Sequence, residues 1–296
     1  MATYDCTMFL NENDLYEIRL NQHWNFVDKF IVVEAEETHT GLPKPLNFDH
    51  KRFEPYAEKI QYVTFKSFDE EIPKHRELID QSVIADIGPA HDIVDWTRDH
   101  FQFNYFYKIL QDQGAAENDI VYFSCLDEII KESAFYRCID IINQTPWIED
   151  INPIFSFNLY LYAYKINLLH RHWTQHYAAN LTTFRNFRKY LPETIRQRVR
   201  THTIPDAGWH FTFLDPTDGE LVLAKQRSWA HSKDVYPGKK VKFDHVTKEE
   251  ALQRFWDDYD VNIVDVKEDT HPEYIMQNLD KFQNFIFHGE KPNGNI

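Results

Sequence analysis

Two adjacent acids follow one of the most hydrophobic runs of the chain. The run Ile120-Val-Tyr-Phe123 is typical of a buried strand, and Asp127 and Glu128 come shortly after its end. Ligands of open α/β sheets bind beyond the carboxyl ends of the strands, so both acids would lie where a substrate binds. A carboxylate there can hold a divalent cation, which in turn holds a diphosphate. The other interpretation is structural, with Asp127 capping the next helix and Glu128 solvated in its first turn.

Several histidines also have a setting suited to chemistry. His210 and His231 each come one or two residues after a tryptophan in a strand-like segment. An imidazole there can bind a metal or relay a proton, or it can be a buried histidine with satisfied hydrogen bonds. The segment 170–176 is similar to a zinc site because His172 and His176 are one helical turn apart, but no fourth ligand is evident. An aromatic acceptor-binding surface is the favoured interpretation of that segment.

The composition limits how the chain can bind phosphate. Its 296 residues include eight glycines, and none of them are spaced as G-x-G-x-x-G or G-x-x-x-x-G-K. Glycine-rich phosphate loops are therefore absent, and a bound nucleotide needs a metal or basic side chains instead. The formal net charge is −15, from 32 Lys and Arg against 47 Asp and Glu. Such a charge disfavours nonspecific binding to nucleic acid or to an anionic membrane.

Cysteine usage and hydropathy predict a soluble, cytoplasmic, single-domain protein. The three cysteines are too few and too scattered for a disulfide framework or a Cys-x-x-Cys metal site. Residues 1–10 lack the basic flank and apolar core of a signal peptide. No run approaches the roughly 18 apolar residues of a membrane span. Without a linker or an internal repeat, we expect one domain over 1–288 followed by a polar tail over 289–296.

Short apolar runs alternate with helical patterns, which is typical of an α/β fold with a mostly parallel central sheet. Strands are predicted at 4–10, 27–34, 60–65, 120–123, 154–164, 211–213 and 221–224. Helices are predicted at about 11–23, 96–113, 131–143 and 248–256, with a further short helix inside 67–94. Glu34 ends its strand, so it is expected beside the same sheet edge as Asp127.

Blocks spread along the chain resemble one known family. Three blocks near the N-terminus are similar to the opening of glycosyltransferase family 17, namely residues 10–20 (LNENDLYEIRL), 27–34 (VDKFIVVE) and 40–46 (TGLPKPL). This is the family of the bisecting β-1,4-mannosyl-glycoprotein N-acetylglucosaminyltransferase and its microbial relatives. Leu126-Asp-Glu-Ile129 resembles the family's Asp-x-Asp-Glu-Ile segment, and Gly208-Trp-His210 and residues 225–231 resemble later blocks. On this resemblance the chain is identified as a microbial or viral member.

The resemblance implies the single-domain A-type fold of nucleotide-diphospho-sugar transferases, with a central, mostly parallel sheet. It also implies a metal-dependent, inverting transfer of N-acetylglucosamine from UDP-N-acetylglucosamine to a glycan or polysaccharide hydroxyl, with Mn²⁺ or Mg²⁺ as cofactor. One position departs from the family, because Cys125 stands where the first Asp of the motif is expected. A thiol is a soft ligand that suits neither cation. Asp127 would then make the metal contact without help from residue 125. Otherwise, the cysteine means weaker use of the metal, a different donor or a loss of activity.

The same resemblance implies a set of site residues. The donor-binding residues are Glu34, Lys44, Arg98, Asp99, Cys125 and Asp127. The metal ligands are Asp127 and His231. The catalytic residues are Glu128 or Asp206 as the base, with His210 facing the sugar or acceptor. The acceptor-binding residues are Trp209 and Trp229, whose rings would stack on a sugar.

The donor assignments outside the acidic motif have structural alternatives. Glu34 would accept hydrogen bonds from the base or ribose of the donor, or it is a surface acid. Lys44 lies between two prolines on a stiff loop and would contact phosphate. Arg98 would offset the charge of the diphosphate, or it forms, with Asp99, an exposed charged pair of the kind common at helix starts.

Three other functions stay compatible with the sequence. A glycosyltransferase-like sugar-binding protein without activity would keep the aromatic cleft. A glycosidase would need two carboxylates across a cleft and no nucleotide. A transferase acting on modified nucleic acid would need a basic groove, which the negative net charge disfavours. The residues that would form such a groove, or else a solvated basic helix face, are Arg185, Arg188, Lys189, Arg196, Arg198 and Arg200.

Overall fold

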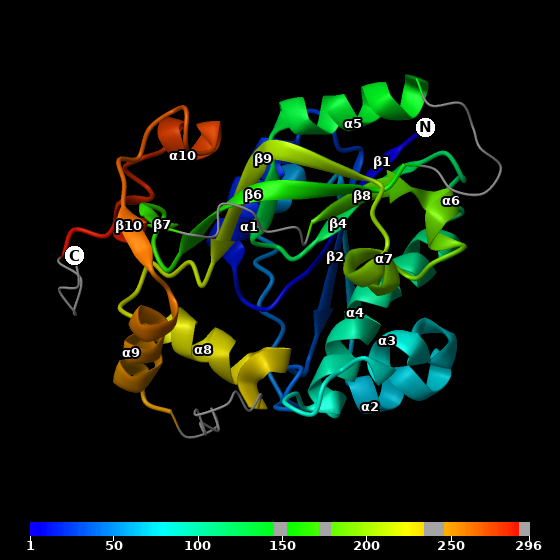
Figure 1. Ribbon diagram of the computed structural model, residues 1–296, viewed down its shortest axis with the longest axis horizontal. Coiled ribbons are helices and arrows are strands. Elements are labelled where there is room, and N and C mark those ends of the chain that lie inside the picture. The colour runs from blue at the N-terminus through cyan, green and yellow to red at the C-terminus, as the bar shows by residue number, and fades with distance from the viewer. Residues whose placement is uncertain (145–152, 172–178, 234–245, 290–296) are drawn as a thin grey trace.

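A central sheet organises the protein (Figure 1). The structure is a computed structural model that describes residues 1–144, 153–171, 179–233 and 246–289. Along the sheet, the strands follow the order β10 (Val261–Ile263), β7 (Leu168–His170), β6 (Phe155–Ala163), β8 (Asn180–Thr183), β4 (Ile120–Ser124), β1 (Thr3–Met8), β2 (Lys29–Ala35) and β3 (Ile60–Phe65). Off this path, β9 (His202–Thr212) pairs with β6 and with β5 (Glu128–Ile130). His172, His176 and residues 290–296 of the expected tail lie outside the described residues.

The strands of the N-terminal half form the parallel part of the sheet. β1 lies between β2 and β4, β3 pairs with β2, and all three pairings are parallel. Beyond β4, the pairings β4–β8, β8–β6, β6–β7 and β7–β10 are antiparallel. β9 is parallel to β6 and antiparallel to β5. The carboxyl ends of β1, β2 and β4 therefore meet at one edge, where a ligand site is expected.

Helices cover both faces of the parallel part. Phe30 of β2 belongs to the same buried cluster as residues of α1 (Asn13–His23) and α5 (Glu132–Gln144). Ile31 points to the other face and belongs to the cluster that contains residues of α4 (Ile93–Asp112). Figure 1 shows α5 and α4 on opposite sides of the sheet. Burial on both faces explains why β2 is a continuous apolar run, and it confirms the predicted α/β class.

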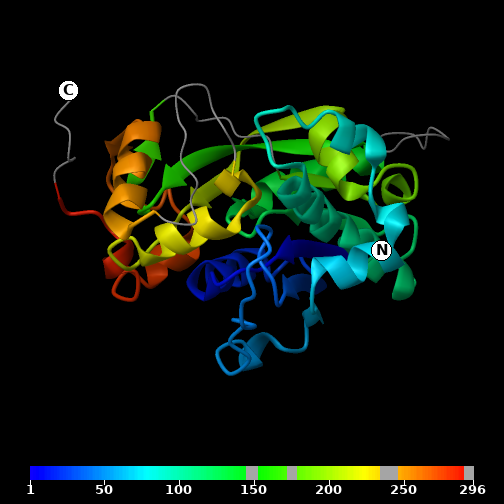
Figure 2. The same cartoon turned by 90° about the horizontal axis from the view of Figure 1, so that it is seen from below.

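Shorter helices complete the fold. They are α2 (Phe68–Glu71), α3 (Gln81–Ala85), α6 (Phe184–Phe187), α7 (Pro192–Arg198), α8 (Glu220–Ser228), α9 (Lys248–Asp258) and α10 (Glu273–Gln277). The helices α8 and α9 lie side by side at one end of the molecule in both views (Figures 1 and 2). No helix in the described ranges is long and apolar enough to cross a membrane.

One predicted element is wrong in type. The segment 221–224, predicted as a strand, belongs to α8. The buried carboxylate of Asp215 accepts hydrogen bonds from the backbone N–H groups of Leu221 (2.9 Å) and Val222 (3.1 Å), which satisfies the first turn of the helix. A short apolar run does not distinguish strand from helix by its periodicity, so this cap decides the outcome. The correction matters because α8 carries Lys225 into the site described below.

Candidate active site

A cavity of about 550 Å³ opens where β1, β2 and β4 end. Its walls come from the segments after these strands, from β9, and from α4, α7 and α8. The cationic residues of the lining are Lys44, Arg196, Arg200 and Lys225. The acidic residues of the lining are Glu12, Glu37, Asp99, Asp127 and Glu128. The volume is typical of small-molecule sites, and the position is the one that open α/β sheets use for ligands.

Arg19 contacts the backbone of the acidic segment from the protein interior. Its side chain is fully buried, and its Nη1 donates hydrogen bonds to the carbonyl oxygens of Cys125 (2.7 Å), Leu126 (3.3 Å) and Glu128 (2.9 Å). Its Nη2 and Nε donate to the Asp5 carboxylate. Three carbonyl groups that point inward fix the backbone of this short turn. The acids at its tip are thereby positioned by a residue more than a hundred positions earlier in the sequence.

Asp127 lines the cavity as half of an ion pair. Lys225 Nζ lies 2.6 Å from Asp127 Oδ2, and His210 Nε2 lies 3.5 Å from the same oxygen. Burial opposes ionisation of Asp127, but Lys225 and His210 hold the pKa of its carboxyl below the ordinary value. Burial likewise opposes charge on Lys225, and Asp127 holds the pKa of that ammonium above its ordinary value. Both partners are therefore charged at neutral pH.

Glu128 and Cys125 stand beside this pair. Glu128 pairs with His210 in the β5–β9 ladder, and its Oε2 accepts a hydrogen bond from the Cys125 backbone N–H (3.0 Å). Burial raises the pKa of the Cys125 thiol well above its ordinary value, although the nearby Arg196 acts in the opposite direction. Arg196 Nη2 lies 3.5 Å from the sulfur. Cys125 is thus a neutral thiol at neutral pH, which is a poor ligand for Mg²⁺ or Mn²⁺.

Aromatic side chains form another wall of the cavity. Trp96, Trp229 and His231 all line it, and the His231 ring lies 4.5 Å from Trp96 and 4.8 Å from Trp229 between centroids. The Trp229 indole Nε1–H is buried and has no hydrogen-bond partner among the described residues. A flat ring with an unused donor suits a sugar or a base, whose faces are apolar and whose edges accept hydrogen bonds.

Four of the predicted site residues do not line this cavity. Asp206 forms an ion pair with Lys131 (2.6 Å), and its side chain is 63% exposed. Trp209 is buried, and its Nε1–H donates to the carbonyl oxygen of Thr270 (2.8 Å). The remaining two, Glu34 and Arg98, support loops that border the cavity.

Glu34 orders the loop that carries Lys44. Its carboxylate is fully buried and contacts Lys44 Nζ (2.5 Å), the Asn47 backbone N–H (2.8 Å) and the Tyr62 hydroxyl (2.7 Å). These contacts place Glu34 beneath the cavity wall rather than against a ligand. Lys44 itself lines the cavity, and its contact with a donor phosphate stays a prediction.

Arg98 packs under the neighbouring turn. Its Nη1 donates to the carbonyl oxygen of His39 (3.2 Å), and its Nη2 lies 3.2 Å from Asp69. A Cβ on Gly41 would lie only 2.6 Å from Arg98 Nη1, and Gly41 has a φ of +84°, so only glycine suits this turn. Asp99 lines the cavity and lies 3.5 Å from His39 Nδ1.

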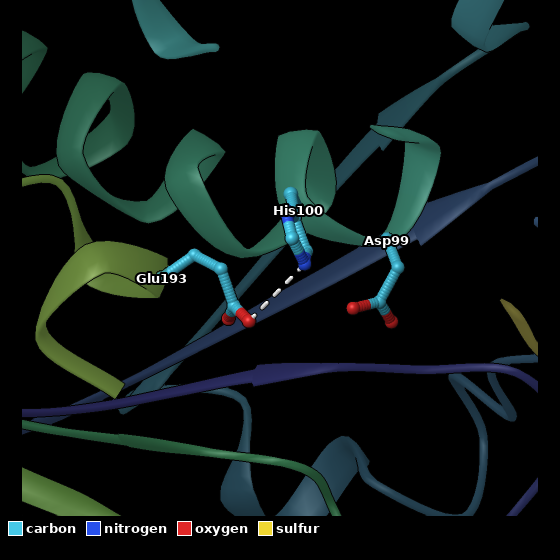
Figure 3. Close-up of side chains that lie close together, drawn as sticks. All are labelled: Asp99, His100 and Glu193. Atoms are coloured by element: carbon cyan, nitrogen blue, oxygen red, sulfur yellow. Dashed lines mark ion pairs between the residues drawn. The ribbon is translucent and has the colours of Figure 1, made fainter. Parts of the chain in front are cut away.

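Asp99 also belongs to a cluster able to hold a divalent cation. Asp99 and His100 come from α4 and Glu193 from α7 (Figure 3), and each offers a ligand atom within 4.8 Å of the others. His100 Nε2 lies 3.5 Å from Glu193 Oε1. Among the described residues, this is the one group of three such ligands, so neither Asp127 nor His231 belongs to one. Glu193 also lies 3.5 Å from the Arg196 guanidinium, which would repel a cation.

Three basic residues that line the cavity were not predicted as site residues. Lys225 begins one of the family-like blocks, and Arg196 and Arg200 belong to the predicted basic groove. In the structure, Arg196 turns inward to the cavity, whereas Arg185 and Arg188 pair with Glu117 on the surface. The signal available in the sequence was chemical, because a chain without a glycine-rich phosphate loop needs cations elsewhere.

These observations define a class of protein. Helices on both faces of the sheet, parallel strands ending at one edge, and a cavity there with paired acids and cations are the parts of an A-type nucleotide-sugar transferase. The chain belongs to glycosyltransferase family 17, because the model of that family matches residues 2–257. The predicted family and the fold it implies are thereby confirmed, and the protein is a glycosyltransferase by membership.

Similarity to solved structures is distant. The crystal structure of 4-diphosphocytidyl-2C-methyl-D-erythritol synthase is 13% identical, with a TM-score of 0.39 over 69% of this chain and 89% of that one. The Francisella tularensis 2-C-methyl-D-erythritol 4-phosphate cytidylyltransferase is 9% identical, with a TM-score of 0.34 over 69% of this chain and 90% of that one. Likenesses at this level carry no inference about function. No curated protein matches the chain.

Proposed function

We propose that the protein transfers N-acetylglucosamine from UDP-N-acetylglucosamine to a glycan hydroxyl, with inversion at the sugar carbon. The observation that carries the proposal is the cavity of this family 17 chain, which combines acids, cations and aromatic rings where the parallel strands end. Its volume of about 550 Å³ is sufficient for a small-molecule ligand. A bacterial or viral polysaccharide or lipid-linked glycan is the proposed acceptor class, and the cytoplasm is the proposed location.

Inversion requires one displacement. A base takes the proton of the acceptor hydroxyl, the acceptor oxygen forms the new bond to the sugar carbon, and the bond to the diphosphate breaks from the opposite face. The departing UDP leaves with the electron pair of that bond. We assign the base to Glu128, because it lines the cavity, whereas Asp206 pairs with Lys131 at the surface. His210, beside Asp127, would face the acceptor, and Trp229 would stack on a sugar.

The Mn²⁺ or Mg²⁺ that the family resemblance implies does not fit the donor set at Asp127. The Lys225 ammonium already contacts Asp127 Oδ2 at 2.6 Å, and the Cys125 thiol is protonated. No third ligand completes a group around Asp127 in the described ranges. The group that can accept a divalent cation is Asp99, His100 and Glu193, and the metal-dependent form of the proposal would have to use it. We route no step through a cation at Asp127.

A panel of nucleotide sugars tests the proposal. We expect UDP-N-acetylglucosamine to raise the melting temperature and to release UDP when a glycan acceptor is added. Glu128→Gln keeps a side-chain oxygen for the Cys125 N–H but removes the base, so kcat should fall by about 10²- to 10⁴-fold while the affinity for UDP changes little. Asp206→Asn is the matched control and should leave kcat unchanged.

Each result has a defined meaning. Donor binding without transfer in the wild-type protein would favour the sugar-binding alternative, and failure of every nucleotide sugar to bind would refute the proposal. Full turnover by Glu128→Gln would remove only the assignment of the base.

A further inference from the structure

We propose that Lys225 takes the place of the divalent cation in the donor site, so that the protein binds a nucleoside diphosphate without metal. This inference rests on the proposed function, and it names how that site neutralises the donor. Lys225 comes from α8, its Nζ lies 2.6 Å from Asp127 Oδ2, and both residues line the cavity. No glycine-rich loop is present in the sequence to bind the diphosphate instead.

The geometry leaves part of the Lys225 ammonium for a ligand. Its side chain is 21% exposed, whereas Asp127 is 5% exposed, so the ammonium lies at the boundary between the protein and the cavity. An ammonium has three N–H donors, and one of them is directed to Asp127 Oδ2 at 2.6 Å. The Phe213 ring lies 5.5 Å from Nζ on one side and accepts no strong hydrogen bond. The other donors are available to oxygens of a diphosphate in the cavity.

The charge of the ammonium is secured by its partner. Asp127 holds the pKa of Lys225 above its ordinary value despite burial, so the side chain is cationic throughout the physiological range. Arg196 and Arg200 line the same cavity and add positive charge that one ammonium cannot supply alone. A diphosphate carries more than one negative charge. The three cationic side chains would together neutralise it, as a metal ion and basic side chains do in metal-dependent sites.

A divalent cation at Asp127 would meet this ammonium at close range. The two would share one carboxylate, and like charges at that separation repel strongly in a partly buried site. Of the two neighbours of Asp127 described above, Cys125 offers a protonated thiol rather than an oxygen, and Glu128 already accepts the Cys125 backbone N–H through Oε2. Asp127 Oδ1 has no hydrogen-bond partner among the described residues, but one oxygen does not hold Mg²⁺, which demands near-octahedral coordination.

Calorimetric titration with UDP tests the inference directly. The wild-type protein should bind UDP in EDTA, with an affinity within about twofold of that in Mn²⁺. Lys225→Met keeps the length of the side chain and removes the charge, so the affinity in EDTA should fall by about 10- to 100-fold, the range of one charge-assisted hydrogen bond. Lys225→Arg should retain most of the affinity. Lys233→Met is the control, since Lys233 pairs with Asp95 and does not line the cavity.

The outcomes separate the inference from the proposed function. UDP binding that appears only with Mn²⁺, or an unchanged affinity in Lys225→Met, would overturn the inference and leave the transferase proposal standing. If UDP, GDP, ADP and CDP all fail to bind with or without Mn²⁺, the proposed function itself is wrong. Should Lys225→Met unfold because it leaves the buried Asp127 carboxylate beside His210 alone, the double variant Asp127→Asn with Lys225→Met removes that charge and is expected to show the same loss.

Discussion

Replacing Arg19 by Met should destabilise the protein more than any surface substitution. Arg19 and Asp5 are both fully buried, and the guanidinium contacts the carboxylate through Nε (3.0 Å) and Nη2 (2.5 Å). Burial opposes ionisation of Asp5, but Arg19 and His23 hold the pKa of its carboxyl below the ordinary value. The carboxylate is therefore charged at neutral pH, and removal of Arg19 would leave it buried beside a histidine alone.

The magnitude follows from that uncompensated charge. Breaking a buried ion pair by removing one partner costs about 3–5 kcal/mol. The backbone carbonyl oxygens that lose Arg19 add less to this cost. Tyr122 Oη still donates to the carbonyl oxygen of Glu128 at 2.8 Å, and Ser124 Oγ still donates to the carbonyl oxygen of Cys125 at 2.9 Å. We therefore expect the free energy of unfolding to fall by about 4 kcal/mol in Arg19→Met.

Urea denaturation, followed by tryptophan fluorescence, measures the change. Arg52→Met is the matched control, because Arg52 also pairs with two carboxylates, Asp14 and Glu17, but its side chain is 25% exposed. Its loss should cost about 1 kcal/mol or less. Asp5→Asn combined with Arg19→Met removes both charges and keeps an acceptor for His23, so it should recover part of the stability. Equal effects of Arg19→Met and Arg52→Met would refute the reasoning.

Two further predictions concern pH and a close backbone approach. Burial lowers the pKa of His271, whose Nε2 lies 2.9 Å from the Ile166 carbonyl oxygen, so the folded protein binds fewer protons than the unfolded chain and stability falls as pH drops below about 6.5. His271→Gln should reduce the difference between the urea midpoints measured at about pH 7.5 and at about pH 5.5. The same difference in His271→Gln as in the wild-type protein would contradict this prediction. Gly208→Ala would place a Cβ 2.1 Å from the Ile129 carbonyl oxygen at a φ of +155°, so it should cost about 2–4 kcal/mol. Gly88→Ala, whose Cβ would have no neighbour nearer than 3.9 Å, should stay within about 0.5 kcal/mol of wild type in the same assay.

The parallel strands were the most predictable part of the fold. The strand at 60–65 is found at Ile60–Phe65, and the strand at 120–123 extends by one residue to Ser124. β4 is buried along its whole length, and β3 follows a turn, so in both cases the local sequence is enough to predict a strand. β5 is only three residues long, and it exists because Glu128–Ile130 pairs with β9, a partner about eighty positions away. No local pattern predicts such a strand.

The candidate site was predictable in its position and less so in its contacts. Asp127, Glu128 and His210 were named from the sequence, and all three line the cavity. Glu34 was predicted to contact the donor, but its buried carboxylate accepts hydrogen bonds from the Lys44 ammonium and from the backbone N–H groups of Asn47 and Phe48. The difference between these two roles depends on the path of that loop, which contains two prolines and few periodic residues. Sequence spacing fixes the neighbourhood of a side chain but not its hydrogen-bond partners.

The electrostatics of the site arise from two positions that are far apart in sequence. In the family's Asp-x-Asp pattern, two carboxylates share one turn, and a cation of charge two would balance them. Here Cys125 is a neutral thiol, so Asp127 carries the single charge of the pair, and one ammonium from α8 balances it. The thiol at one position and the lysine at the other are therefore consistent with each other. The net charge of −15 predicts none of this, because the charge that a diphosphate meets is set by the few side chains that line the cavity.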